Sequence, residues 1–319
     1  MLYFLDNASN VKGGPNENYA RELMELHTIG VDGGYTQKDV VEVARCFTGW
    51  TITLWEEGGK NGTFRFDRDS HDEGRKTVLG LPIAGGRPGN VDARRVVDLL
   101  ASHPACARFI STKLCRRFVA DNPPQSIVDS TVATFRATDG DIKAVLRTIF
   151  TSAEFAAAAD QKLKRPFEFV VSALRTLDAR VAPEAVESLI WPLYSLGQVP
   201  FEWELPDGYP DVGVSWASTN GLLNRWNLGS TLLLNWYDGV NIPVRALVRR
   251  TRAKTPAGLV DGFAALLLQR GLDAPDRERL AAHVAAGRAP DAPAPAWFLN
   301  QKAQELVALL LGSPYFQWR

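Results

Sequence analysis

Hydrophobic residues recur every three or four positions along most of the chain, which is the spacing of amphipathic helices. The first such stretch runs from about residue 16 to 28 and carries its apolar positions on one stripe. The second begins at Thr36, which together with Asp39 resembles a capping box, and it ends before Gly49. A pair of glycines separates the two stretches, so the sequence predicts a hairpin of two short helices.

The pattern changes between residues 50 and 90, where the runs TITLW and TFRF alternate like short strands and Gly and Pro are frequent. Residues 191–217 are also irregular and are rich in Trp, Tyr, Pro and Gly. Helical periodicity is found at 91–102, 104–120, 127–137, 141–151, 166–178, 218–237, 256–270, 275–287 and 297–311. The sequence therefore predicts a mainly α fold, a multi-helix bundle with a short β-like, loop-rich insert and a long irregular aromatic loop.

The length of 319 residues and the hydrophobic content of 45% allow one large domain or two packed lobes. We predict an N-terminal helical lobe over residues 1–180, which contains the helix hairpin and the insert. A C-terminal helical lobe over residues 181–319 would contain the aromatic loop.

Charge and hydropathy limit the partners. The 36 basic and 36 acidic residues cancel, so no overall field attracts nucleic acid, and we expect no nucleic-acid partner. No run of apolar residues approaches the roughly 20 needed to span a membrane. The first residues lack the basic and apolar regions of a signal peptide, so the chain as written shows no export signal.

The cysteines and histidines give no sign of a conventional metal centre. Cys46, Cys106 and Cys115 are too few for a disulfide framework, and we interpret all three as buried thiols. The four histidines do not have the spacing of zinc ligands, and there is no CxxC. Nucleotide-binding and nucleophile-elbow motifs are missing too, so we expect neither a metal nor a cofactor.

The densest polar cluster lies in PNENYARELMELHTIG, where Glu22 and Glu25 are one helical turn apart. Paired carboxylates can serve as the acid and base of a hydrolase. A second interpretation is a metal site, formed by Glu22, Glu25, His27, Asp39 and Glu42. A third is a solvated ion-pair network that braces the hairpin, formed by Glu17, Arg21, Glu25 and Arg45.

A second cluster lies in FDRDSHDEGRKTVLG. Its acidic residues do not match the spacing of a calcium-binding EF-hand. His71 and Asp72 could supply a general base and its orienting partner, because imidazole titrates near neutral pH. The alternative is a loop that Asp and His side chains tie down by hydrogen bonds to backbone amides.

The third cluster is the aromatic loop, which places Trp203, Tyr209 and Trp216 among several carboxylates. Aromatic faces beside carboxylates are typical of sugar-binding clefts, where rings stack and hydroxyls are hydrogen-bonded. The alternative is that the aromatic side chains pin an irregular segment to the surface of a helical bundle.

Four segments occur in a characteristic order: PNENYARELMELHTIGVDGGYTQKDVVEVARCFTGW, HDEGRKTVLG, KLCRRFV and GQVPFEWELPDGYP. Together they resemble the bacterial family called domain of unknown function 1800. The resemblance implies an exported protein, often secreted by the twin-arginine route and often encoded beside an uncharacterised sulfatase-like family. Typical members carry a long helical region ahead of the segment that here begins at Met1, so the chain is similar to a member truncated at its N-terminus.

We therefore expect a periplasmic or extracellular protein that acts as a carboxylate-based hydrolase on polysaccharide. The expected catalytic residues are Glu22, Glu25, His71 and Asp72. The expected substrate-binding residues are Arg21, His27, Trp203, Tyr209 and Trp216. The alternative is a non-catalytic assembly or binding protein that partners the product of the neighbouring gene, which predicts an exposed apolar patch.

Overall fold

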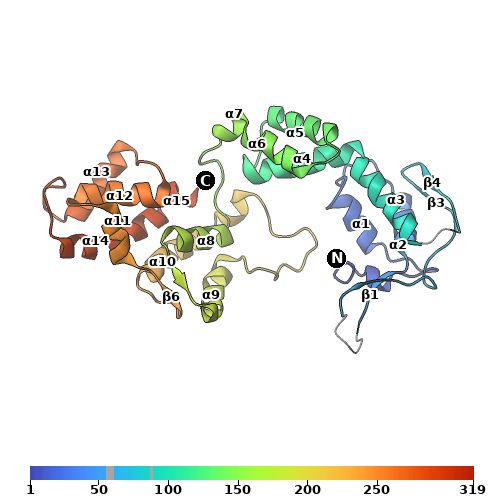
Figure 1. Ribbon diagram of the computed structural model, residues 1–319, viewed down its shortest axis with the longest axis horizontal. Coiled ribbons are helices and arrows are strands. Elements are labelled where there is room, and N and C mark those ends of the chain that lie inside the picture. Colours follow the sequence, from blue (N-terminus) through green and yellow to red (C-terminus); the bar gives the residue numbers. More distant parts are fainter. Residues whose placement is uncertain (55–60, 87–88) are drawn as a thin grey trace. The chain divides into compact units, whose positions relative to one another are not determined.

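The computed structural model describes residues 1–54, 61–86 and 89–319, and most of these are helical (Figure 1). The predicted mainly α fold is confirmed. The described chain divides into two compact units. The first unit comprises Met1–Ala157 and Glu204–Gly208, and the second comprises Ala158–Trp203 and Tyr209–Arg319.

The first unit combines short helices with two small hairpins. In chain order its elements are η1 (Asn7–Ser9), α1 (Asn18–Glu25), α2 (Gln37–Phe47), β1 (Trp50–Ile52), β2 (Phe64–Phe66), β3 (Lys76–Val78), β4 (Leu81–Ile83), α3 (Gly89–Ser102), α4 (Pro104–Phe118), α5 (Gln125–Ala137), α6 (Ile142–Phe150) and α7 (Ala153–Ala156). Strand β1 pairs with β2 and β3 pairs with β4, both antiparallel. The predicted β-like insert is thus present, although Trp55 at the end of TITLW lies outside the described residues.

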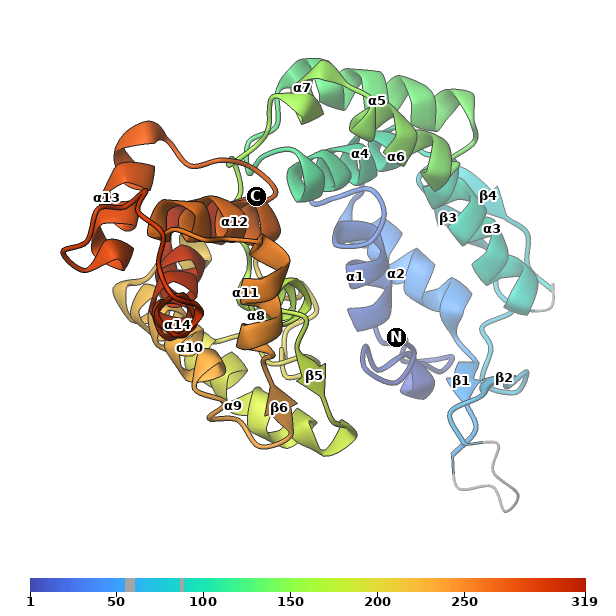
Figure 2. The same cartoon turned by 60° about the vertical axis from the view of Figure 1, so that its left-hand side comes forward.

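The predicted helix hairpin is formed by α1 and α2, which lie side by side in both views (Figures 1 and 2). The capping box is confirmed, because Thr36 Oγ1 accepts a hydrogen bond from the amide of Asp39 while the Asp39 carboxylate accepts one from the amide of Thr36. Helix α1 begins at Asn18, whose amide donates to Asn16 Oδ1 at 3.0 Å. Asn16 therefore caps from one position further out than the sequence suggests.

Two buried asparagines close the end of α2. Asn7 Nδ2 donates to the carbonyls of Phe47 and Trp50 at 3.2 and 2.7 Å, and Asn10 Nδ2 donates to the carbonyl of Ala44 at 2.9 Å. The last carbonyls of a helix have no partner within it, and leaving them buried and unpaired is costly. The N-terminal segment is thereby fixed against the hairpin.

The second unit is helical apart from one two-residue strand pair, β5 with β6. In chain order its elements are α8 (Pro166–Thr176), β5 (Arg180–Val181), η2 (Pro183–Ala185), α9 (Val186–Leu196), η3 (Gly213–Trp216), α10 (Thr219–Leu233), β6 (Val240–Asn241), α11 (Val244–Thr251), α12 (Pro256–Leu268), α13 (Ala274–Ala285), α14 (Ala296–Gly312) and α15 (Pro314–Gln317). Helix α14 packs against α10, α11 and α12 (Figure 2).

Three features of the second unit differ from the sequence expectation. The unit begins before α8 rather than at residue 181, because Phe169, Val170 and Ala173 of α8 belong to its core. Helix α9 extends to Leu196, into the region that was expected to be irregular. That expectation was wrong here because the helix contains Pro192, a residue that normally disfavours a helix interior. Helix α11 was not expected, because a stretch of only eight residues gives little periodic signal.

Among the described helices, none is both long and apolar enough to cross a membrane. All three cysteines are free and buried, as expected. Burial raises the pKa of the Cys46 thiol to about 12 and also raises the pKa values of Cys106 and Cys115.

We predict that the thiols of the folded protein react slowly with a disulfide reagent such as DTNB, because the thiolate is the reactive form and burial suppresses it. Absorbance at the thionitrobenzoate band should report three thiols promptly in guanidinium chloride and almost none under native conditions. Rapid reaction of any thiol in the native protein would contradict the buried positions.

Candidate functional site

Helix α1 presents the two carboxylates that the sequence singled out. Glu22 and Glu25 are both partly buried and lie one turn apart. Among the described residues, neither forms an ion pair. The nearest cation in sequence is Arg21, whose Nη2 donates instead to Glu17 Oε2 at 3.1 Å and to Gln37 Oε1 at 2.7 Å. Of the expected bracing network, the pair of Arg21 with Glu17 is present, whereas Arg45 pairs with Glu42 and Asp72.

The two carboxylates have different surroundings. Burial, and next the negative charge of Glu25, raise the pKa of Glu22 above its ordinary value. Glu25 accepts a hydrogen bond from the Tyr35 hydroxyl at 3.3 Å. A carboxyl group with a raised pKa keeps its proton at higher pH, which a general acid requires.

His27 lies just beyond the C-cap of α1, Leu26, and is exposed. Partial burial of the ring, and then the positive charge of Lys113, lower the pKa of His27. The Lys113 ammonium group donates to the carbonyl of Leu26 at 3.0 Å, which holds the lysine beside this end of the helix. The predicted substrate contacts of Arg21 and His27 stay predictions.

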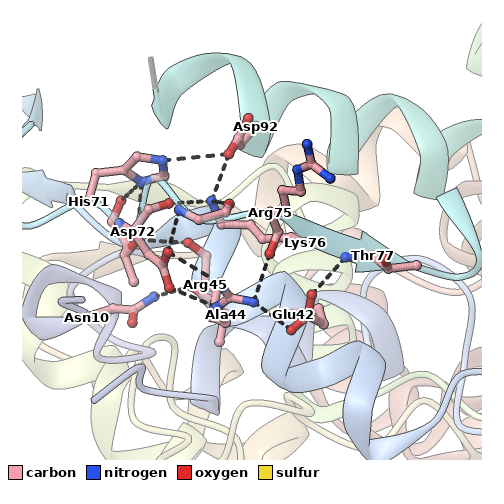
Figure 3. A network of polar contacts seen from close by, with 12 residues as sticks. Asn10, Glu42, Ala44, Arg45, His71, Asp72, Arg75, Lys76, Thr77 and Asp92 are labelled. Atoms are coloured by element: carbon pink, nitrogen blue, oxygen red, sulfur yellow. Dashed lines mark hydrogen bonds and ion pairs between the residues drawn. The ribbon is translucent and has the colours of Figure 1, made fainter. Parts of the chain in front are cut away.

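His71 lies in the interior of the first unit and is 2% exposed (Figure 3). Its Nδ1 is 2.9 Å from the carbonyl oxygen of Thr48, so Nδ1 carries a proton and donates it. Its Nε2 faces Asp92 Oδ2 at 3.6 Å. The imidazole is thus held through Nδ1, while Nε2 is buried and has no hydrogen-bond partner within the described residues.

Asp92 also pairs with Lys76, whose Nζ lies 2.9 Å from Asp92 Oδ2. The side chains are 0% and 2% exposed, so this is a buried ion pair. Lys76 Nζ donates in addition to the carbonyls of Asp72 and Gly74. These acceptors offset part of the cost of removing the ammonium group from water.

Asp72 connects this pair to α2. Arg45 Nε donates to Asp72 Oδ2 at 2.7 Å, and Arg45 Nη1 donates to Glu42 Oε1 at 2.8 Å (Figure 3). The Arg45 guanidinium lowers the pKa of Asp72. The other oxygen of Glu42 accepts the amide of Thr77 at 2.7 Å, so the contacts continue into β3.

The contacts of His71 and Asp72 are those of a loop fixed by hydrogen bonds to backbone groups. The Asp72 carboxylate accepts the amide of Gly74 at 2.8 Å, as that interpretation requires. Within the described ranges, no hydrogen bond or ion pair links this network to Glu22 or Glu25. The catalytic role of His71 and Asp72 stays a prediction.

The five residues considered as metal ligands serve different purposes. Asp39 accepts the amides of Thr36 and Leu79, and Glu42 is engaged by Arg45 and Thr77. In the part of the chain that the structure describes, no group of three or more His, Cys, Asp or Glu side chains is arranged to hold a metal ion.

The aromatic residues of the third cluster lie in the second unit and contact one another. The ring centroids of Trp203 and Tyr209 are 4.8 Å apart, and those of Tyr209 and Trp216 are 6.0 Å apart. The Tyr209 hydroxyl donates to the carbonyl of Val199 at 2.8 Å, and Trp216 Nε1 donates to that of Pro210 at 3.0 Å. These contacts are the ones expected if the rings pin the loop.

The four segments on which the resemblance rests lie in the hairpin, the loop that contains His71, helix α4 and the aromatic loop. A family model described as "Protein of unknown function (DUF1800)" matches residues 1–318. The chain belongs to this family. Comparisons with curated proteins and with solved structures gave no match.

Sequence reasoning missed the buried charges of this DUF1800 member. Lys76 and Val78 are both buried while Thr77 between them is exposed, so the alternation of β3 points the lysine inward. In the second unit, Arg225 is fully buried. Its Nη2 donates to the carbonyl of Lys164 at 2.7 Å, and burial lowers its pKa to about 10.

We predict that Lys76→Met destabilises the first unit by about 3–5 kcal/mol, because it leaves the Asp92 carboxylate buried without its partner. Urea unfolding followed by circular dichroism measures the loss. The double variant K76M/D92L should recover much of it. The matched control is Arg68→Met, which removes a cation 80% exposed and 3.7 Å from Glu73 and should cost less than about 1 kcal/mol.

Proposed function

We propose that this DUF1800 protein hydrolyses glycosidic bonds of a polysaccharide, with Glu22 as the general acid and Glu25 as its partner carboxylate. The observation that carries the proposal is the raised pKa of Glu22 beside Glu25, in a pair that no cation neutralises within the described residues. Resemblance to exported family members supports a periplasmic or extracellular location.

The spacing of the pair suits the reaction. Residues three apart on a helix have Cβ atoms about 5–6 Å from each other, so their carboxyl groups can reach the separation of about 5 Å used by retaining glycosidases. Glu22 would protonate the leaving oxygen while Glu25 attacks the anomeric carbon and forms a glycosyl ester. Glu22 would then deprotonate the water that hydrolyses this ester, which releases the sugar and restores both carboxyl groups. The Tyr35 hydroxyl orients Glu25, while Arg21 and His27 would contact the substrate.

The proposal does not require the other predicted site residues to touch the substrate. His71 and Asp72 would act by holding the insert against α2, on which the position of α1 depends. Trp203, Tyr209 and Trp216 would give the aromatic loop its shape, and a sugar would meet only those ring surfaces that their mutual packing leaves free.

We predict that Glu22→Gln and Glu25→Gln each lower the rate of hydrolysis by about 10²–10⁴-fold, because each removes an acid, base or nucleophile without changing the size of the side chain. Release of reducing ends from a set of neutral polysaccharides measures the rate. The control is Glu73→Gln, in the same unit and paired with the exposed Arg68, which should keep nearly full activity. Equal activity in the parent protein and the three variants would exclude Glu22 and Glu25 as the catalytic residues.

The pKa of Glu22 can be tested without a substrate. Titration of the side-chain carboxyl by ¹³C NMR should place the midpoint of Glu22 above the ordinary value of 4.5. Glu25→Gln should move that midpoint downward, because it removes a neighbouring negative charge, and the effects of burial, Arg21 and Asp207 should remain. An unchanged midpoint would mean that the two carboxylates do not interact.

One observation favours the assembly alternative. A groove of about 500 Å³ in the first unit is lined mainly by apolar side chains: Met1, Leu2, Tyr3, Ile52, Leu54, Gly62 and Phe64. Tyr3 is 69% exposed and Phe64 is 54% exposed, which is unusual for such large side chains without a partner.

If a partner covers this groove, the protein should co-purify with the sulfatase-like product of the neighbouring gene when the two are co-expressed. Replacement of Tyr3 and Phe64 by Ser should abolish the complex and leave the fold intact, because both side chains are exposed. A complex that survives these changes must use another surface.

A further inference from the structure

The second unit carries a cavity of about 560 Å³ where α11 and α14 meet. Its lining residues are Val244, Arg245, Trp297, Asn300, Gln301 and Gln304. Four of them come from α14 at positions separated by three, one and three residues, which places them on one face of the helix. The face therefore combines one large aromatic ring with three amides.

The exposure of Trp297 needs a reason. The side chain is 63% exposed, so core packing does not account for it. In the part of the chain that the structure describes, its aromatic contact is an edge-to-face one with Phe298, at a centroid distance of 5.9 Å. An indole face of this kind is a platform on which the apolar face of a sugar ring can stack.

The amides beside this platform are partly fixed by the protein. Asn300 Nδ2 donates to the carbonyl of Ala296 at 2.7 Å, and Gln304 Nε2 donates to that of Leu233 at 3.1 Å. Within the described residues, Asn300 Oδ1 is buried and has no hydrogen-bond partner. Such an acceptor is unfavourable unless a donor is supplied.

The charge of the lining indicates the class of ligand. Arg245 is its single ionisable side chain, and the other polar groups are neutral amides that both donate and accept, as sugar hydroxyls do. One cation is too little for a nucleic-acid surface, which needs several phosphate contacts. The volume is within the range of small-ligand pockets.

We propose that this cavity is a non-catalytic binding site for a neutral saccharide, with Trp297 as the stacking platform and Asn300, Gln301 and Gln304 as the hydroxyl partners. The site goes beyond the proposed hydrolysis and does not depend on it, because it shares no residue with α1. It would hold a polysaccharide chain whether or not the protein cleaves it.

Isothermal titration of the full chain with cellotetraose, chitotetraose and maltotetraose tests the proposal. At least one should bind saturably at low-millimolar concentration or below. Trp297→Ala should weaken that binding by about 10-fold or more, and Gln301→Ala should weaken it less. The control is Trp236→Ala, which removes an equally exposed indole, at 74%, from outside the cavity and should leave the affinity unchanged.

The outcomes separate this site from the catalytic proposal. Glu22→Gln and Glu25→Gln should bind the saccharide as the parent does, so a protein that binds but does not hydrolyse sinks only the proposed function. No binding of any of the three probes, or an unchanged affinity in Trp297→Ala, overturns the saccharide site. Tight binding of single-stranded oligothymidylate that Trp297→Ala abolishes would assign the platform to a nucleic acid instead.

Discussion

The buried pair of Lys76 and Asp92 is the interaction on which the first unit depends. Removing two charges from water is expensive, and the attraction between them repays the cost only when further hydrogen bonds satisfy both groups. The carbonyls of Asp72 and Gly74 do this for the ammonium group, whereas among the described residues Asp92 Oδ1 has no hydrogen-bond partner and His71 Nε2 lies 3.6 Å from Oδ2. Each of these partners must be in place at once, which fixes the loop between β2 and β3 relative to α3.

The need to pair buried and partly buried charges also determines which carboxylates of the hairpin have no ion pair among the described residues. Arg45 of α2 forms ion pairs with Asp72 and Glu42, and the pair with Asp72 connects the loop to α2. Arg21 of α1 forms an ion pair with Glu17. Both arginines of the hairpin are thus engaged by carboxylates. Glu22 and Glu25 are left beside each other, and burial, and next the charge of Glu25, raise the pKa of Glu22. The unusual electrostatics of α1 follow from the support that the rest of the hairpin needs.

Sequence periodicity predicted the helices well, and local chemistry predicted the capping box of Thr36 and Asp39, because both signals depend on residues close together in the chain. The buried charges depend on contacts between distant residues, such as that of Lys76 with Asp92, and a three-residue strand offers too little alternation to reveal them. The placement of Glu22 and Glu25 on one helix was predictable for the same local reason. The contact of Arg21 with Glu17 was one of the interpretations that the sequence allowed, whereas its hydrogen bond to Gln37 on the next helix was not predictable from local spacing.

Composition and exposure give opposite indications in the second unit. In the segment richest in aromatic residues, three rings pack on one another, because Tyr209 contacts two tryptophans and its hydroxyl bonds to Val199. Trp216 is 7% exposed, whereas Phe201 of the same segment is fully exposed. A single tryptophan in a stretch of ordinary helical composition, Trp297, remains open beside three amides. An irregular segment lacks regular backbone hydrogen bonds, so packing among its aromatic side chains helps to stabilise its shape. A helix already has those bonds, so it can leave a ring free for a ligand, and a rigid helical face also positions that ring at little entropic cost.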